Sequence, residues 1–392
     1  MDKLIRNRQK RVYLDHAATT PVDPRVLDAM LPYFTEEYGN PASIHTFGQR
    51  AEFALDTARQ TLAEVLSCSD KEVVFTSGGS ESDNLALRGI ALAAREQRSA
   101  NHILTTKIEH PAVTKTAEQL SSIYGFDVEY LPVDQYGRVE PAVVEQRLRD
   151  DTAVVSIMYA NNEVGTINPI PDIGAICRGK KVPLHTDAVQ AAAYLPTDVN
   201  HLQVDALSIG AHKLYGPKGS GALYLRAGTP ILPMLTGGSQ EFGLRAGTSN
   251  IPYIVGLAEA MRLAHEERDK RVQHLLPLRA QIIDQVITTI PEAELTGHPD
   301  QRMPNHTSFV FKSVDGNALI TALDMGGYAC SSGSACKTGD PEPSAVLTVL
   351  GYDREMALGS LRVTLGSHTT QQDVEEFLAV LPGLISRNRQ LS

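Results

Sequence analysis

The chain has 392 residues, enough for two or three domains of ordinary size. Its 46 acidic residues outnumber its 36 basic ones, and the formal charge of -10 argues against direct binding to nucleic acid or to an anionic membrane surface. The four cysteines form no CxxC pair, which excludes a zinc ribbon and a secreted disulfide scaffold and is typical of a cytoplasmic protein.

The N-terminal segment 1–11 is basic and polar, and we expect it to be flexible. No apolar stretch follows it, so we expect neither a signal peptide nor a membrane anchor. The spacing of apolar residues then predicts helices at 24–34, where Pro24 suits the first helical position, and at 49–66.

Short β-rich runs then alternate with helical runs. Strands are expected at 72–76, 102–106, 128–133, 153–159, 182–186, 206–209 and 222–225. Helices are expected between them at 81–95, 112–124, 141–148 and 173–178. This alternation predicts an α/β fold with a seven-stranded, mostly parallel sheet covered on both faces. Ligands of such sheets bind beyond the carboxyl ends of the strands.

The pattern changes after Gly256, where a long polar helix is expected at 254–289 with a break near Pro277. The remaining pattern predicts strands at 307–311, 328–331 and 361–365, and helices at 316–325, 344–350 and 371–386. We therefore expect a large domain at 12–262, whose first residues pack on the small domain, and a smaller C-terminal α/β domain at 263–392.

Lys213 follows an apolar strand pattern at 204–209 and precedes a glycine-rich turn at 216–221. A lysine held at a strand end and partly desolvated has a lowered pKa and acts as a nucleophilic amine. The alternative is an ordinary surface lysine. The small residues around Lys213 favour close packing against a ligand, so we interpret it as a Schiff-base lysine for pyridoxal 5'-phosphate (PLP).

The segment 76–84, Thr-Ser-Gly-Gly-Ser-Glu-Ser-Asp-Asn, lies between a predicted strand and a predicted helix. Its two glycines let the backbone approach an anion, and Ser80 with Asp83 forms a capping-box pattern at the helix start. The free amides of that helix N-terminus suit a phosphate, although the same residues also start ordinary helices. The segment is neither a Walker A loop nor a GxGxxG fingerprint.

Asp187 directly follows a buried strand pattern, where a carboxylate needs a partner. A pyridinium N–H would supply that partner, and Gln190 one turn later suits the ring hydroxyl. The alternative is that Asp187 caps the next helix. His110, at a strand–helix junction, suits stacking on a ring, and Asn162 suits ligand hydrogen bonds. Taken alone, both are better explained as a structural histidine and a turn residue.

Cys336 lies in a long run of small, turn-forming residues at 331–344. A cysteine in such a polar loop, beside Lys337, is a candidate reactive thiolate, whereas Cys330 on the preceding strand pattern is expected to be packed. Arg362 lies within a strand pattern. If its side chain faces inward it would grip a substrate carboxylate bidentately, and otherwise it is an exposed strand arginine.

With these residues together, the chain resembles the cysteine desulfurases of the NifS/IscS type, which are fold-type I PLP enzymes of the class V aminotransferase superfamily. The resemblance extends from Val12 to about Ser386. It rests on motifs at 13–21, 39–43, 75–84, 109–110, 161–165, 187–190, 212–219, 244–248 and 331–336.

The resemblance implies that Lys213 carries PLP and that Cys336 is the catalytic nucleophile. It implies that Asn162 and Arg362 bind the substrate carboxylate. The expected reaction converts L-cysteine to L-alanine and leaves a persulfide on Cys336, which a sulfur-acceptor protein of an iron–sulfur cluster or thio-modification pathway then takes. The alternatives are a selenocysteine lyase or a class V aminotransferase on the same scaffold, or a non-catalytic PLP protein, which the presence of Lys213, Asp187, Arg362 and Cys336 disfavours. The Ser-Gly-Ser-Ala-Cys motif at 332–336 favours sulfur chemistry.

For the cofactor, the resemblance implies phosphate contacts from Gly79, Ser80 and His212, with Thr248 supplied by the other subunit of a homodimer. The remaining contacts that it implies are stacking on the ring by His110, pairing of the ring nitrogen by Asp187, and hydrogen bonds from Gln190 and Asn162. The resemblance also implies that His110 is a catalytic residue. Several positions depart from the usual pattern of the family: Gly210 replaces a serine that would contact the phosphate, Phe242 replaces an arginine, Ser239 replaces a glycine, and Cys330 is an additional cysteine.

Overall fold

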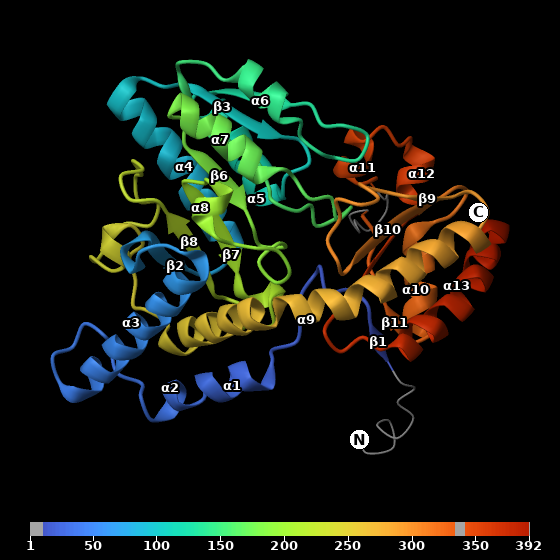
Figure 1. Cartoon of the computed structure of the whole chain (residues 1–392), viewed down its shortest axis with the longest axis horizontal. Coiled ribbons are helices and arrows are strands. Elements are labelled where there is room, and N and C mark those ends of the chain that lie inside the picture. The colour runs from blue at the N-terminus through green and yellow to red at the C-terminus, as the bar shows by residue number, and fades with distance from the viewer. Residues whose placement is uncertain (1–10, 334–341, 392) are drawn as a thin grey trace.

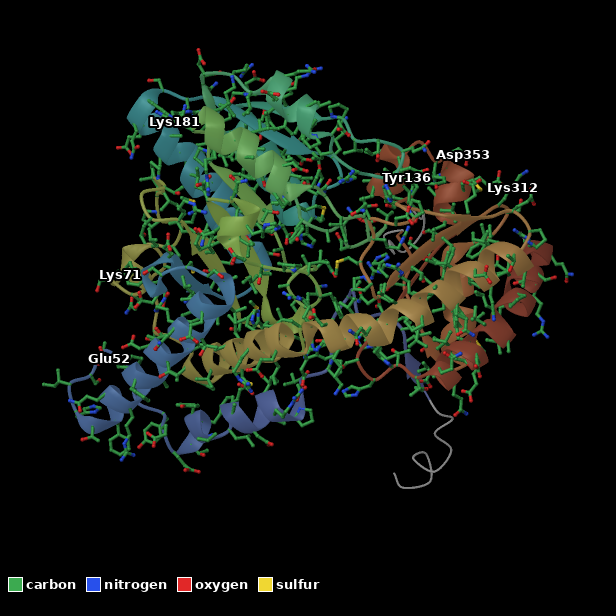
Figure 2. The ribbon with its side chains drawn as sticks, in the orientation of Figure 1. Glu52, Lys71, Tyr136, Lys181, Lys312 and Asp353 are labelled. Atoms are coloured by element: carbon green, nitrogen blue, oxygen red, sulfur yellow. The ribbon has the colours of Figure 1, made fainter. Side chains whose placement is uncertain are left out.

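The computed structural model describes residues 11–333 and 342–391. Most of the segment 1–11 and the predicted nucleophile Cys336 therefore lie outside the described residues. The predicted α/β fold with a seven-stranded, mostly parallel sheet is confirmed. Side chains such as Lys71, Lys181 and Asp353 point outward into solvent around this body (Figure 2).

The large sheet has the strand order β2-β8-β7-β6-β5-β3-β4. β8 runs antiparallel to both of its neighbours, and the other strands run parallel to one another. The bounds of its strands are β2 (Val73–Thr76), β3 (His102–Thr106), β4 (Asp127–Leu131), β5 (Thr152–Ser156), β6 (Leu184–Asp187), β7 (Ala206–Gly210) and β8 (Gly221–Leu225). The central strands are buried along their whole length, as expected for a sheet covered on both faces.

Helices cover both faces of this sheet (Figure 1). One face packs against α4 (Gly79–Arg98) and α5 (Pro111–Ser122) through an apolar cluster that includes Leu87, Ile103 and Leu223. The other face shares a larger core with the remaining helices around it. Those helices are α3 (Thr46–Leu66), α6 (Pro141–Arg147), α7 (Ile170–Lys180), α8 (Val199–Leu202) and the N-terminal part of α9 (Ile251–Thr289).

A second, three-stranded antiparallel sheet has the order β12-β10-β9. Its strands are β9 (Ala293–Leu295), β10 (His306–Phe311) and β12 (Ser360–Thr364). The helices of this part are α10 (Gly316–Met325), α11 (Ala345–Val349), α12 (Arg354–Leu358) and α13 (Gln371–Leu391). The short strand β1 (Val12–Tyr13) crosses over to pair in parallel with β11 (Tyr328–Ala329).

Helix α9 continues through Pro277, so the predicted break there is wrong. Buried residues on both sides of the proline, Leu275 and Leu278 among them, anchor the helix against the core and outweigh the missing backbone hydrogen bond. Because α9 runs from one sheet to the other (Figure 1), the expected domain boundary at 262 falls inside a single helix and stays a prediction.

Two further helices begin or end differently from the predicted pattern. The helix expected at 24–34 is divided into α1 (Pro24–Met30) and α2 (Pro32–Thr35), because Pro32 has no N–H to continue the first helix. Helix α4 is capped by Gly78 and not by Ser80, so the predicted capping box of Ser80 and Asp83 is wrong.

None of the helices in the described part of the chain is long and apolar enough to span a membrane.

Candidate active site

A cavity of about 570 Å³ lies beyond the carboxyl ends of the parallel strands β6 and β7, where ligands of such sheets bind. Segments far apart in the chain meet there: the start of α4, the loop before α5, and Arg362 of β12. The predicted site residues that line it are Gly79, Ser80, His110, Asn162, Asp187, Gln190, His212, Lys213 and Arg362. These residues, which were predicted from the sequence, therefore lie together around one cavity.

Lys213 lies in the short 3-10 turn η2 (Ala211–Lys213) that directly follows β7. Its Nζ donates hydrogen bonds to Ala18 O at 2.7 Å and to Ala17 O at 2.5 Å. Burial lowers the pKa of Lys213 to about 8, helped by the nearby Arg362 guanidinium. Its amine therefore has the lowered pKa that suits a nucleophile and proton carrier.

The turn that carries Lys213 is fixed by the N-terminal segment of the chain. Thr20 N and Thr20 Oγ1 both donate to His212 O at 2.9 Å, and Tyr215 N donates to Thr20 Oγ1 at the same distance. Tyr215 adopts the left-handed region at φ 67°, which turns the chain sharply after the lysine. His212 is neutral, because burial and the adjacent Lys213 lower its pKa to about 4.

The N-terminus of α4 faces the cavity without a side-chain cap. Among the described residues, the amides of Gly79, Ser80 and Glu81 have no hydrogen-bond acceptor. The Glu81 carboxylate turns away from them to accept from Ser77 N at 2.8 Å and from Arg245 Nε at 2.8 Å. The free amides and the positive end of the helix dipole make this a site for an anion such as a phosphate.

Glycine is required at the first residue of that helix. A Cβ on Gly79 would lie 2.5 Å from Val189 Cγ2, which is closer than any real contact. A Cβ on Gly210 would lie 3.4 Å from Gly79 N and so would point at the same free amides. The absence of a side chain at both glycines thus leaves the free amides at the start of α4 open to a ligand.

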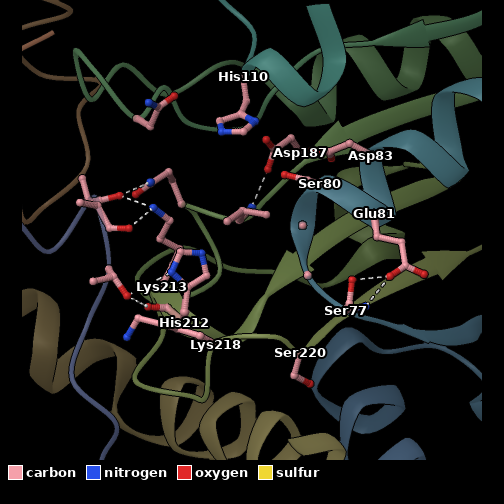
Figure 3. A pocket seen from close by; sticks show the side chains of 18 of the residues that line it. Ser77, Ser80, Glu81, Asp83, His110, Asp187, His212, Lys213, Lys218 and Ser220 are labelled. Carbon is pink, nitrogen blue, oxygen red and sulfur yellow. Dashed lines mark hydrogen bonds between the residues drawn. The ribbon is translucent and has the colours of Figure 1, made fainter. Parts of the chain in front are cut away.

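Asp187, the last residue of β6, is buried beside His110 (Figure 3). Its Oδ1 accepts from Val189 N at 2.9 Å, as a capping aspartate would, while its Oδ2 has no partner among the described residues. Burial raises the pKa of Asp187, and the hydrogen bond from Val189 N and the positive charge of Lys213 oppose that rise. A cationic ring nitrogen in the cavity would complete the pairing of this carboxylate.

His110 and Gln190 are both held by backbone hydrogen bonds. His110 caps α5, where its Nδ1 accepts from Ala112 N at 3.1 Å, and burial lowers its pKa, so the imidazole is neutral. Gln190 Nε2 donates to Ala17 O at 2.9 Å. The ring of His110 is therefore fixed in orientation beside Asp187, and this suits stacking on a planar ligand.

Arg362 lies at the middle of β12 with its side chain buried against the cavity. Its Nη1 donates to Asn162 O at 3.0 Å, and its Nη2 donates to Asp15 Oδ1 at 2.9 Å. The inward orientation expected for a carboxylate-binding arginine is thus present, and the exposed alternative is excluded. Sequence analysis did not identify Asp15, although it lies in the motif at 13–21.

Two acids are buried here, Asp83 in the lining of the cavity and Glu109 next to His110, and their burial was not predicted from the sequence. Asp83 Oδ1 lies 3.6 Å from His185 Nε2, and burial together with the charge of Asp187 holds its pKa well above the usual range. Burial raises the pKa of Glu109 to about 8, although Met158 N and Thr106 Oγ1 both donate to it at 2.9 Å. Glu109 belonged to a recognised motif, but nothing local in the sequence indicated that either carboxyl is buried.

Thr248, predicted to act in the site of a second subunit, is exposed and lines a neighbouring hollow with Phe75, Thr76 and Ser220. That hollow shares Ser220 with the main cavity. The structure contains one chain, so the role of Thr248 stays a prediction.

The residues present fit PLP. The free amides of α4 and the Gly79 cradle suit its phosphate, the Asp187 Oδ2 atom suits its pyridinium nitrogen, and the Lys213 amine suits its aldehyde carbon. Lys213 lies opposite His110 and Asp187 across the cavity (Figure 3), so a planar ring between them would reach all three.

The family model described as aminotransferase class V matches residues 12–377. A cysteine desulfurase IscS of Methanosarcina thermophila is 46% identical over 388 residues, covering 99% of this chain and 95% of the relative. A protein of the same name from Dictyoglomus turgidum is 44% identical and covers 98% and 97%. The solved structure of a NifS-like protein superposes with a TM-score of 0.89 at 39% identity, covering 96% of this chain and 100% of that one. DndA from Streptomyces lividans gives a TM-score of 0.77 at 35% identity over 90% and 99%.

Proposed function

The chain belongs to the class V aminotransferase family and, within it, to the cysteine desulfurases, and on that premise we propose that it is a PLP-dependent cysteine desulfurase. It converts L-cysteine to L-alanine and passes the sulfur to an acceptor through Cys336. The observation that carries the proposal is one cavity in which the Lys213 amine, the Asp187 carboxylate and the free amides of α4 meet.

Different residues of the cavity would contact the phosphate and the ring of the cofactor. PLP, when bound, withdraws electrons from the substrate Cα and so makes its C–H bond acidic. The α4 amides, Ser80 and His212 hold the phosphate. Asp187 keeps a negative charge beside the ring nitrogen, and His110 orients the ring from one face.

The Lys213 Nζ atom has two tasks. It would hold the cofactor at its aldehyde carbon, and its amine is placed to move the proton at the substrate Cα. A pKa of about 8 suits both tasks, because about a tenth of the amine is unprotonated at pH 7, far more than for an ordinary lysine. Arg362 and Asn162 meanwhile fix the substrate carboxylate, which orients the Cα–H bond toward Lys213.

Sulfur transfer falls to Cys336. The Cys336 thiolate forms an S–S bond to the sulfur of L-cysteine while the substrate C–S bond breaks. The carbon fragment keeps the electron pair of that bond and takes up a proton to become L-alanine. A sulfur-acceptor protein, of an iron–sulfur cluster or thio-modification pathway, then receives the persulfide sulfur. The enzyme acts as a cytoplasmic homodimer, in which Thr248 completes the phosphate site of the other subunit.

The test supplies purified protein with L-cysteine and a thiol reductant, and measures sulfide and alanine. We expect equal amounts of the two products from the parent and almost none from Cys336→Ser. The matched control is Cys330→Ser, whose thiol is buried and has its pKa raised by burial, so this variant should keep its activity.

Other outcomes would point to other functions. Full turnover by Cys336→Ser would refute the assignment of the nucleophile. Formation of 3-mercaptopyruvate without release of sulfide would indicate an aminotransferase, and turnover of selenocysteine alone would indicate a lyase. A colourless protein with no chromophore that borohydride reduces would refute the cofactor assignment.

A further inference from the structure

Asp15 lies beside the Arg362 guanidinium and outside the lining of the cavity. Its Oδ1 accepts from Arg362 Nη2 at 2.9 Å, and its Oδ2 accepts from Ser331 Oγ at 2.8 Å. The side chains of Asp15 and Arg362 are only 15% and 10% exposed. Both carboxylate oxygens are therefore engaged in a largely buried, charge-assisted contact, which fixes geometry better than an exposed ion pair does.

The backbone around Asp15 holds this contact from two sides. Asp15 forms a parallel bridge with Thr364, and Thr364 N donates to Leu14 O at 2.8 Å. Ser331 forms an antiparallel bridge with Arg362, and Arg362 N donates to Ser331 O at 2.7 Å. The N-terminal segment thus lies against β12 at the point where the arginine leaves the strand.

The contacts of Arg362 leave part of its guanidinium for a ligand. Nη1 donates to Asn162 O at 3.0 Å and Nη2 donates to Asp15. Nε is buried and has no hydrogen-bond partner within residues 11–333 and 342–391. A guanidinium has five N–H donors in a fixed plane, so anchoring two of its nitrogens fixes the direction of the remaining donors.

Asp15 also offsets positive charge at this end of the cavity. Arg362 and Lys213 both line the cavity, and the arginine lowers the pKa of Lys213 while Asp15 and Asp187 raise it. Asp15 is the acid that contacts the arginine directly. Its negative charge therefore reduces the repulsion between Arg362 and Lys213 before a substrate carboxylate binds.

We propose that Asp15 is a positioning residue for substrate recognition: it orients the Arg362 guanidinium so that the free N–H groups meet the carboxylate of the amino-acid substrate. The proposal rests on the proposed function, because it takes Arg362 as the group that binds this carboxylate. Asp15 itself touches neither substrate nor cofactor.

The test uses the holoenzyme and two competitive inhibitors that each carry part of the substrate. 3-Mercaptopropionate has the carboxylate and the thiol, and cysteamine has the amine and the thiol. In Asp15→Ala we expect the KM for L-cysteine and the inhibition constant of 3-mercaptopropionate to rise about tenfold, because a charge-assisted contact that orients the guanidinium is lost. The inhibition constant of cysteamine should not change, and kcat should fall less than KM rises.

Two companion variants separate positioning from folding. Asp15→Asn keeps an acceptor for Arg362 and should restore both constants to within about threefold of the parent, since orientation and not charge alone is at work. Asp15→Ser is too short to reach Arg362 Nη2 and should behave like Asp15→Ala. The matched control is Asp127→Ala, which removes an exposed aspartate that pairs with Arg149 on the outer strand β4, and this variant should leave all three constants unchanged.

Arg362→Ala distinguishes failure of this inference from failure of the proposed function. If Arg362→Ala weakens 3-mercaptopropionate and Asp15→Ala does not, the positioning role is wrong and the carboxylate site stands. If Arg362→Ala also leaves that inhibitor unchanged, the carboxylate site itself is wrong. An equal rise for both inhibitors in Asp15→Ala would show a general loss of structure and would overturn the positioning role.

Discussion

Adding a hydroxyl at Gly210 should tighten cofactor binding. Gly210 has φ -127° and ψ 121°, an extended conformation that serine adopts without strain. A Cβ there would lie 3.4 Å from Gly79 N, so the hydroxyl of Gly210→Ser would reach the phosphate cradle. The same Cβ would lie 3.3 Å from Val189 Cγ1, and that side chain must yield by a few tenths of an ångström.

The two effects have opposite signs, and the hydrogen bond is the larger. A hydrogen bond to a charged group contributes about 1.5–3 kcal/mol, and slight overpacking costs about 1 kcal/mol. The net gain of about 1 kcal/mol corresponds to an affinity about fivefold higher. Because the covalent bond to Lys213 would mask this change, the dissociation constant of PLP is best measured by fluorescence in a Lys213→Ala background.

Gly210→Ala is the matched control, since it adds the same Cβ without a hydroxyl. We expect it to bind PLP as weakly as the parent or more weakly. If Gly210→Ser and Gly210→Ala weaken binding equally, crowding against Val189 dominates and the reasoning about the cradle is refuted.

Three further predictions concern buried charges. First, capture of PLP by the cofactor-free protein should become faster with rising pH and reach half its maximal rate near pH 8, because only unprotonated Lys213 reacts; a midpoint above pH 10 would contradict this. Second, Arg59→Met should lower the free energy of unfolding in urea by about 3–5 kcal/mol, because the buried Glu241 carboxylate loses its charged partner. Arg59 donates two hydrogen bonds of 2.7 and 2.8 Å to that carboxylate. The control Arg147→Met, at an exposed ion pair, should lower it by less than about 1 kcal/mol. Third, the pKa of the Glu109 carboxyl is raised to about 8 in the folded protein, so its contribution to stability is complete below the pKa of the unfolded chain and is lost as the pH rises toward 8. Glu109→Gln does not titrate, so its stability should rise relative to that of the parent between pH 5 and pH 8. Parallel curves of stability against pH for the two proteins would contradict a buried, protonated carboxyl.

Much of the fold and of the site could be predicted because the signals are local. The alternation of apolar strands with amphipathic helices was sufficient for the seven-stranded sheet. Asp187 ends one such strand and Lys213 lies in the turn after another, and the carboxyl ends of parallel strands share one edge of a sheet, so these side chains line one cavity. The break expected at Pro277 inside α9 is wrong because tertiary packing outweighs local preference there, whereas the division of the helix expected at 24–34 follows from the local chemistry of Pro32.

Other parts of the site depend on contacts between segments that lie far apart in the chain, and no local sequence pattern indicates such contacts. The contact of Asp15 with Arg362 joins positions 347 residues apart, and it exists because β1 pairs with β11 and Asp15 forms a bridge with Thr364 of β12. The burial of Asp83 and Glu109 depends on what packs over them, since the same residues at a surface helix start would be ordinary capping acids.

The sequence by itself determined the order of strands and helices, the lysine in the turn after β7 and the glycine-rich start of α4, because periodicity, apolar runs and glycine act within a few residues. Only the tertiary structure decided which side chains are desolvated, which cap α4 uses and how Arg362 is held. Those properties follow from the exclusion of water and from contacts between distant segments, so they exist only once the chain has folded.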